Sequence, residues 1–76
     1  MALAFILMIV QPHSQDEVMR KLEKISEIQE FYTVFGEWDV VAKAKVPDML
    51  ALNSLVSEKI RKIKAVKLTS TLIVAD

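Results

Sequence analysis

The sequence predicts a small α+β domain whose elements follow the order strand, helix, strand, strand, helix, strand. Three patterns predict this order: an apolar opening run, two stretches with apolar residues at helical spacing, and three further stretches rich in aliphatic, aromatic and threonine residues. The 76 residues leave room for one domain, spanning residues 1–76, and a core of that size is only marginally stable by itself. The sequence has no cysteine that could add a disulfide, so we expect association of several copies to supply further stability.

The first expected strand is the apolar run at residues 3–10, which the sequence QPHS ends. An uninterrupted apolar run is typical of a strand that is covered on both faces. The run does not resemble a signal peptide, because no basic residue precedes it and no small-residue cleavage site follows it. It is also too short to cross a bilayer as a helix. We therefore expect a cytoplasmic protein that does not enter the membrane.

The first helix is expected to begin after Ser14. Ser14 and Glu17 have the spacing of a capping box, in which each side chain bonds to the backbone N–H of the other residue. Behind them Val18, Leu22 and Ile25 recur at helical spacing, and Ile28 could extend the stripe. This apolar stripe is expected to cover one face of the sheet.

A hairpin is expected in the middle of the chain, with strands at residues 31–35 and 39–46. Between them the sequence GEWD holds the only glycine, Gly36, and the only tryptophan, Trp38. Tight turns often need a residue with positive φ, which glycine adopts without steric cost. We therefore expect Gly36 to be the positive-φ residue of the turn.

A second helix is expected to open at Pro47 and Asp48. Apolar residues recur along it at helical spacing: Leu52, Leu55, Val56, Ile60 and Ile63. The last expected strand covers residues 66–75. This element order is that of the ferredoxin-like βαββαβ sandwich, in which a four-stranded antiparallel sheet carries both helices on one face.

The other face of this sheet has no expected cover within the chain. With an apolar strand at its centre, that face would expose a hydrophobic patch of a kind that monomers avoid. We therefore expect a second copy to pack on it, which makes the fold dimeric through the sheet face.

Side-chain alternation along the strands predicts which residues face the helices. In the third strand these are Val40, Ala42, Ala44 and Val46, and in the last strand they are Val66, Leu68, Leu72 and Val74. Asp39 and Thr69 would then point together toward the uncovered face, on strands that the first strand separates by roughly 10 Å. A small zwitterion and a partner chain could fill that gap.

The charge balance excludes some classes of partner. Ten basic and ten acidic residues give zero formal net charge, so the chain has no general attraction to nucleic acid or to an acidic membrane. The basic residues at 59–67 fall near the end of the second helix, where cations complement the helix dipole. With one histidine, His13, and no cysteine, we expect no metal site and no cofactor.

Two short motifs stand out. One is Gly36-x-x-Asp39 within VFGEWDVVAKAKV, and the other is Thr69-x-Thr71 within VKLTSTLIV. With them, essentially the whole chain resembles the effector-binding or RAM domain of the Lrp/AsnC family of amino-acid-responsive regulators. The resemblance implies sheet-packed dimers, rings of dimers, and an amino acid or other small effector held between dimers near the hairpin. The ligand-binding residues would be Gly36, Glu37, Trp38, Asp39, Thr69 and Thr71.

Full-length members of that family carry a helix-turn-helix domain that this sequence does not contain. The resemblance therefore implies a stand-alone, non-enzymatic form that binds an effector, and in addition a full-length regulator as partner, without contacting DNA directly.

Two alternatives remain open. At the hairpin, Asp39 could accept backbone N–H groups as in an ordinary turn, and Trp38 could fill a contact between dimers. At the level of function, cofactor-free enzymes of the dimeric α+β barrel type use the same element order and would need an internal pocket, here with His13 and Tyr32. The expected helix-facing positions are nearly all apolar, which favours a binding domain over an enzyme.

Overall fold

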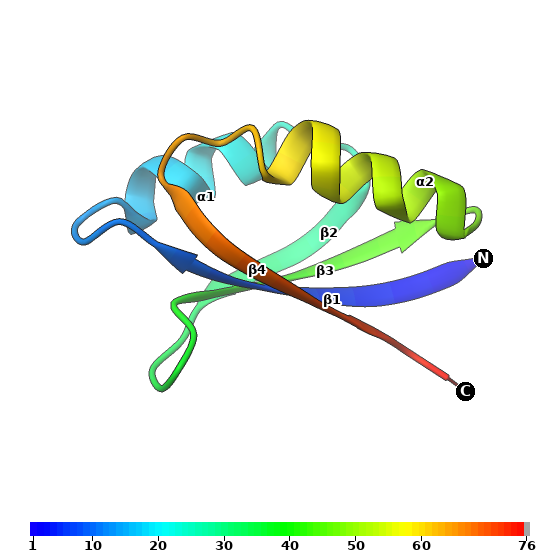
Figure 1. Cartoon of the computed structure of the whole chain (residues 1–76), viewed down its shortest axis with the longest axis horizontal. Helices are drawn as coiled ribbons and strands as arrows, with labels where there is room; N and C mark the ends of the chain where they lie inside the picture. The colour runs from blue at the N-terminus through cyan, green and yellow to red at the C-terminus, as the bar shows by residue number, and fades with distance from the viewer. Residues whose placement is uncertain (76) are drawn as a thin grey trace.

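The computed structural model describes residues 1–75 and has the element order that the sequence predicts. Its elements are β1 (Ala2–Val10), α1 (Gln15–Glu23), β2 (Ile28–Thr33), β3 (Val40–Val46), α2 (Met49–Ser54), the π-helix η1 (Leu55–Ile60) and β4 (Val66–Ile73). The helices lie together over one face of the sheet, and no element formed by residues 1–75 covers the other face (Figure 1). The predicted ferredoxin-like α+β sandwich is confirmed.

The sheet places β1 between two other strands. The strand order is β2-β3-β1-β4, and each neighbouring pair is antiparallel. Burial alternates along β1, with Ala4, Ile6 and Met8 fully buried under the helices while Phe5 and Leu7 on the other face are only half-buried. The continuous apolar run therefore supplies two faces, of which the chain covers one.

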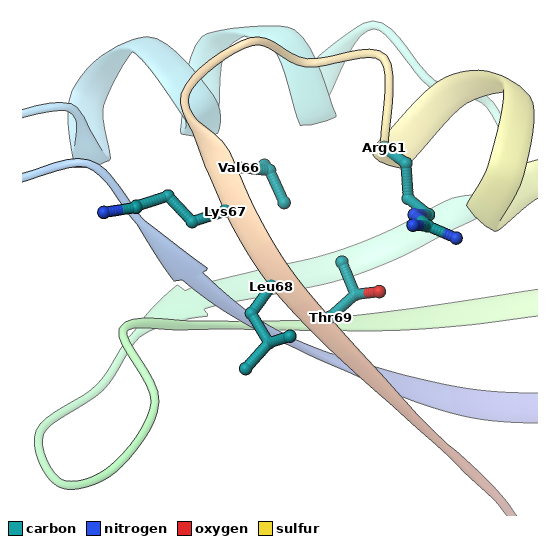
Figure 2. Close-up of a pocket in the computed structure, with 5 residues that line it drawn as sticks. All are labelled: Arg61, Val66, Lys67, Leu68 and Thr69. Atoms are coloured by element: carbon teal, nitrogen blue, oxygen red, sulfur yellow. The ribbon is translucent and has the colours of Figure 1, made fainter.

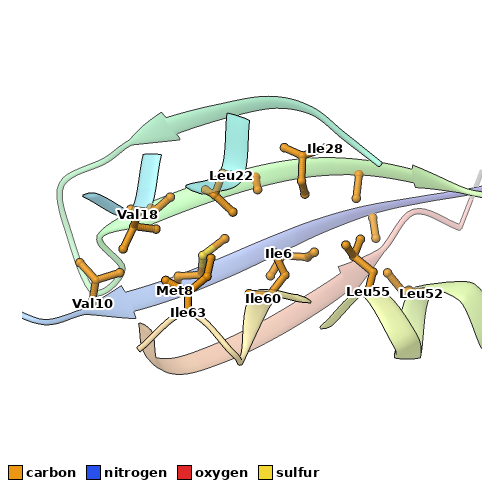
Figure 3. Close-up of a cluster of buried hydrophobic side chains, with 14 of the residues drawn as sticks. Ile6, Met8, Val10, Val18, Leu22, Ile28, Leu52, Leu55, Ile60 and Ile63 are labelled. Atoms are coloured by element: carbon orange, nitrogen blue, oxygen red, sulfur yellow. The ribbon is translucent and has the colours of Figure 1, made fainter. Parts of the chain in front are cut away.

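The core fills the space between the sheet and the helices (Figure 3). The largest fully buried side chains come from both layers: Ile6, Met8, Val18, Leu22, Val40, Val46, Leu52, Leu55 and Ile60. Burial of each such side chain contributes about 1.5–3 kcal/mol relative to exposure. No polar or charged side chain of residues 1–75 is fully buried.

The two helices begin differently. Ser14 precedes α1 as expected, but its side chain makes no capping hydrogen bond, so the predicted capping box is wrong. The backbone of Ser14 has φ −110° and ψ 7°, outside the extended conformation from which an N-cap side chain reaches the first turn. Asp48 does adopt an extended conformation, and its Oδ1 accepts a hydrogen bond from the Ala51 N–H at 2.8 Å.

The second helix widens after one and a half turns. From Leu55 to Ile60 it is a π-helix, and the Arg61 N–H donates to the Val56 carbonyl at 2.8 Å, five residues back. The wider turn lets Leu55 and Ile60, which are five residues apart, both lie buried against the sheet. Ile63, which the sequence placed in the helix, lies beyond its end but is also buried.

β4 contains a bulge at its start. Val66 pairs with Val10, but Leu68 pairs with Ile9, so Lys67 is an extra residue without a partner on β1. One inserted residue reverses the direction of every side chain beyond it, because side chains alternate with a period of two.

The bulge changes which residues of β4 face the helices. Thr69 and Thr71 lie opposite the buried residues Met8 and Ile6 and so share their helix side of the sheet. The predicted alternation is confirmed for β3, where all four expected residues are buried, but it is wrong for β4 beyond Lys67. There the leucines at 68 and 72 lie on the uncovered face.

The hairpin between β2 and β3 is confirmed, but its first strand begins at Ile28, which could have extended the first helix, and ends two residues before the expected 35. Its connection is therefore longer than the expected tight turn. β2 ends at Thr33, and the Val34 N–H donates to the Asp39 carbonyl at 2.9 Å to close the loop. The loop projects from the end of the sheet, away from the helices (Figure 1). No helix within residues 1–75 has the length and hydropathy needed to span a bilayer.

An ion pair links the residue before β2 to η1. The Lys59 Nζ lies 3.0 Å from Oε1 and 3.1 Å from Oε2 of Glu27. The hydrogen-bonded ammonium lowers the pKa of Glu27 below its usual value.

We expect Glu27→Gln to lower the free energy of unfolding at neutral pH by up to about 1 kcal/mol, because the pair is partly exposed. Since the folded-state pKa of Glu27 is lowered, its contribution is complete above the unfolded pKa of about 4.3 and is lost as pH falls through the folded value. Urea unfolding of both proteins should therefore give curves that converge at acid pH. Glu58→Gln is the control, since Glu58 makes no ion pair within residues 1–75. A difference independent of pH would contradict this account.

Candidate functional site

A pocket opens where the hairpin loop passes the start of α1. Its volume is about 360 Å³, and we call it the hairpin pocket; it is lined by Gln15, Thr33, Val34, Phe35, Gly36 and Asp39. Gly36 has φ 127°, so the expectation of a positive φ is confirmed. A side chain at Gly36 would meet no atom within 4 Å, which means that glycine is needed for the backbone conformation and not for space. The structure thus brings Gly36 and Asp39 into one pocket.

Asp39 ties the hairpin loop to the end of β1. Its Oδ2 accepts a hydrogen bond from the Val10 N–H at 2.9 Å, and its own N–H donates to the Met8 carbonyl at 2.9 Å. The carboxylate continues the hydrogen-bond ladder between β1 and β3 at the point where the backbone of β3 turns away. Asp39 thus accepts a backbone N–H as the alternative expects, but the donor lies on β1 and not in the hairpin turn itself. No hydrogen bond from residues 1–75 reaches Oδ1.

The tip of the loop presents aromatic surface. Phe35 is fully exposed, Trp38 is half-buried, and Glu37 is exposed. Glu37 and Trp38 do not line the hairpin pocket, although the resemblance included them among the ligand-binding residues. Phe35 lines the pocket but was not among the residues predicted from the sequence. The available signal was an aromatic residue directly before the turn glycine.

The threonines of β4 lie away from the hairpin pocket. Thr69 lines a pocket of about 300 Å³ beside Arg61 at the start of the strand (Figure 2). Thr71 lines a separate groove between β4 and the second helix. Neither hollow includes Gly36 or Asp39.

The expectation that Asp39 and Thr69 point to the same face is wrong. Thr69 faces the helices because the bulge at Lys67 reverses β4, while the Asp39 carboxylate turns to the Val10 N–H. Within one chain the two predicted motifs therefore do not form a single site.

The uncovered face of the sheet is a second candidate surface. We call it the helix-free face, and its apolar residues are Leu3, Phe5, Leu7, Ile9, Val41, Leu68 and Leu72. Leu68 and Leu72 are 55% and 54% exposed. An apolar surface of this size has no partner among the described elements.

The edge of the helix-free face along β2 is polar. The Tyr32 hydroxyl donates to Oε1 of Glu30 at 2.6 Å, and the Lys43 Nζ lies 3.7 Å from Oε2 of the same carboxylate. The bond from Tyr32, followed by the charge of Lys43, lowers the pKa of Glu30, and the same bond raises the pKa of Tyr32. An apolar centre with a polar rim is typical of protein–protein interfaces.

Two other kinds of site, a metal site and the enzyme pocket with His13 and Tyr32, were considered from the sequence. No three His, Cys, Asp or Glu side chains of residues 1–75 cluster as a metal site would require. His13 is exposed in the loop after β1, Tyr32 is 53% exposed, and the two share none of the pockets found in the described part of the chain.

Comparison with known proteins decides the family. Residues 3–76 match the family model of the Lrp/AsnC ligand binding domain. The chain belongs to this family. The resemblance read from the hairpin and last-strand motifs is thereby confirmed.

Relatives of this Lrp/AsnC domain include longer proteins. It is 36% identical over 73 residues to an uncharacterised helix-turn-helix-type transcriptional regulator of Pyrococcus furiosus, an alignment that covers 92% of this chain and 49% of the regulator. The Lrp/AsnC domain thus spans about half the length of that relative.

Solved structures share the fold. The crystal structure of FFRP-DM1 matches with a TM-score of 0.95 and 39% identity, over 99% of this chain and 100% of its own. A transcriptional regulator of Neisseria meningitidis in complex with L-methionine matches with a TM-score of 0.92, over 99% of this chain and 50% of its own. At 19% identity, the second match establishes likeness of fold alone.

We expect Asp39→Ala to lower the free energy of unfolding by about 1–3 kcal/mol, because it leaves the part-buried Val10 N–H without an acceptor. Asp39→Asn keeps an oxygen that can accept the hydrogen bond from the Val10 N–H, so it should lower the free energy of unfolding by less. Urea unfolding of both variants measures the difference, with Glu37→Ala as the control from the same loop. Equal losses for the alanine and asparagine variants would show that the Val10 bond contributes nothing.

Proposed function

We propose that this Lrp/AsnC domain binds a small amino acid in the hairpin pocket and assembles into dimers and rings of dimers. The observation that carries the proposal is the hairpin pocket, in which Gly36 and the Asp39 carboxylate lie together. Membership of a ligand-binding family supports it. So does the likeness of fold to a regulator in complex with L-methionine.

The pocket suits both charged groups of an amino acid. The ligand's ammonium group would pair with Oδ1 of Asp39, and its carboxylate would accept hydrogen bonds from backbone N–H groups around Gly36. Val34 and Phe35 supply apolar walls for a side chain. A volume of about 360 Å³ lies at the lower end of the range for small-molecule sites, as an amino acid requires.

The remaining predicted residues enter this proposal through a second copy. Glu37 and Trp38 lie at the loop tip beside the fully exposed Phe35, where a neighbouring dimer in a ring would make contact. Thr69, which lies outside the hairpin pocket of its own chain, would reach a ligand only across such a contact, whereas Thr71 lines a different groove of its own chain. The site would then be complete only in the assembly.

The domain would act without catalysing a reaction. The fully buried side chains between sheet and helices are all apolar among residues 1–75, which favours a binding domain over the alternative of a cofactor-free enzyme. Because its relatives include transcriptional regulators, we propose that the domain modulates a regulator by assembling with it, with no direct contact to nucleic acid.

We expect calorimetric titration with the standard amino acids to find saturable binding of at least one. Asp39→Asn should weaken that binding by about 10-fold or more, because an amide loses the charge-assisted bond to the ammonium group. Asp48→Asn is the matched control, since asparagine caps a helix as well as aspartate does. A protein that binds none of the amino acids would overturn the proposed function.

We expect the dimer to form through the helix-free face, with a mass in solution of at least twice 8.6 kDa. Leu7→Lys puts a charge at the centre of that face twice in a symmetric dimer, so it should raise the dissociation constant by about 100-fold or more. Leu50→Lys, at a 77% exposed position on α2, should leave it unchanged. Light scattering across a dilution series measures the dissociation constant of the dimer for the wild type and for both variants. A wild-type monomer, or equal effects of the two variants, would exclude this interface.

A further inference from the structure

A groove separate from the hairpin pocket runs between the edge strand β4 and the second helix. It has a volume of about 330 Å³, and we call it the β4 groove. Met49, Val56 and Ile73 give it apolar walls, while Ser57, Thr71 and Arg61 supply polar groups. It shares no residue with the hairpin pocket.

Two local irregularities build the β4 groove. The bulge at Lys67 turns Thr71 and Ile73 toward the helices, where regular alternation would have turned them away. The π-helix η1 supplies Val56 at its first turn, and Arg61 follows directly at its end. π turns are rare and occur frequently at functional sites.

Arg61 gives the β4 groove a single sign of charge. It is the only charged residue among the described residues that line the groove, and it makes no ion pair within residues 1–75. Figure 2 shows its side chain extending from the end of η1 on the side of β4 to which the Thr69 hydroxyl points, whereas Lys67 extends to the opposite side. An unpaired guanidinium presents a fork of donors that fits a carboxylate.

The apolar walls beside Arg61 are open to a ligand. Met49 is 46% exposed and Ile73 is 48% exposed, on opposite elements of the groove. The Thr71 hydroxyl makes no hydrogen bond within residues 1–75, and Thr71 lines the groove together with Arg61.

We propose that the β4 groove binds a small aliphatic carboxylate that carries no amino group, such as a short branched-chain acid or its 2-oxo derivative. The carboxylate lies on Arg61 and Thr71, and the aliphatic tail packs against Met49, Val56 and Ile73. An amino acid binds there less well, because no acidic side chain lines the groove to pair with its ammonium group and an unpaired charge is costly to desolvate. The hairpin pocket, which contains Asp39, has the opposite preference.

Amide NMR spectra of the deuterated protein test this site by titration with 4-methylpentanoate, leucine and 4-methylpentanamide. The acid should shift the resonances of Val56, Arg61, Thr71 and Ile73 in a saturable way. The amide, which has the same tail without the charge, should bind about 10-fold more weakly or worse, and leucine should also bind the groove more weakly than the acid. Shifts confined to the hairpin residues, or leucine matching the acid at the groove, would overturn the proposal.

Three variants distinguish the contribution of the Arg61 guanidinium to ligand affinity from that of any nearby positive charge. Arg61→Gln should weaken the binding of 4-methylpentanoate by about 10-fold or more, and Arg61→Lys should restore part of the affinity. Lys62→Gln removes a neighbouring exposed cation that does not line the groove and should bind as the wild type does. The spectra themselves report whether each variant is folded. Unchanged affinity of Arg61→Gln, or an equal loss in Lys62→Gln, would overturn the proposal.

Discussion

The position of β1 between two strands is the constraint on which the rest of the structure depends. Its side chains are apolar on both faces, while two short helices are enough to cover only one. The core therefore forms entirely on the helix side, and the helix-free face keeps its leucines and Phe5 at the surface. A chain of this size gains little from a core alone. Covering the helix-free face with a second copy would therefore add to the stability of the fold.

The Asp39 carboxylate makes a structural contact and, in the function proposed above, would also bind the ligand. Its Oδ2 holds the Val10 N–H and so fixes the hairpin loop on the end of β1. The same bond fixes the carboxylate, whose second oxygen accepts no hydrogen bond from residues 1–75, in a residue that lines the hairpin pocket with Gly36. A ligand that paired with Oδ1 would meet a carboxylate already held in place, and would lose less entropy in ordering it.

Much of the fold could be predicted because it depends on apolar periodicity, which the sequence displays directly. The proximity of Gly36 and Asp39 also followed, since they are close in the sequence and share one loop. The location of Thr69 could not be predicted, because it depends on the bulge at Lys67, where neither glycine nor proline marks an irregularity. The π-helix was likewise hidden, since the side chains at its two ends remain buried after the helix widens.

The bulge at Lys67 has a further consequence, for the outer edge of β4. An edge strand exposes unpaired backbone groups that can recruit another strand, and long flat edges lead to open-ended stacking. The extra residue interrupts regular pairing at the start of β4 and places a lysine there. The same irregularity that turns two hydroxyls toward the helices thus also shortens the regular stretch of β4 edge that another strand could extend.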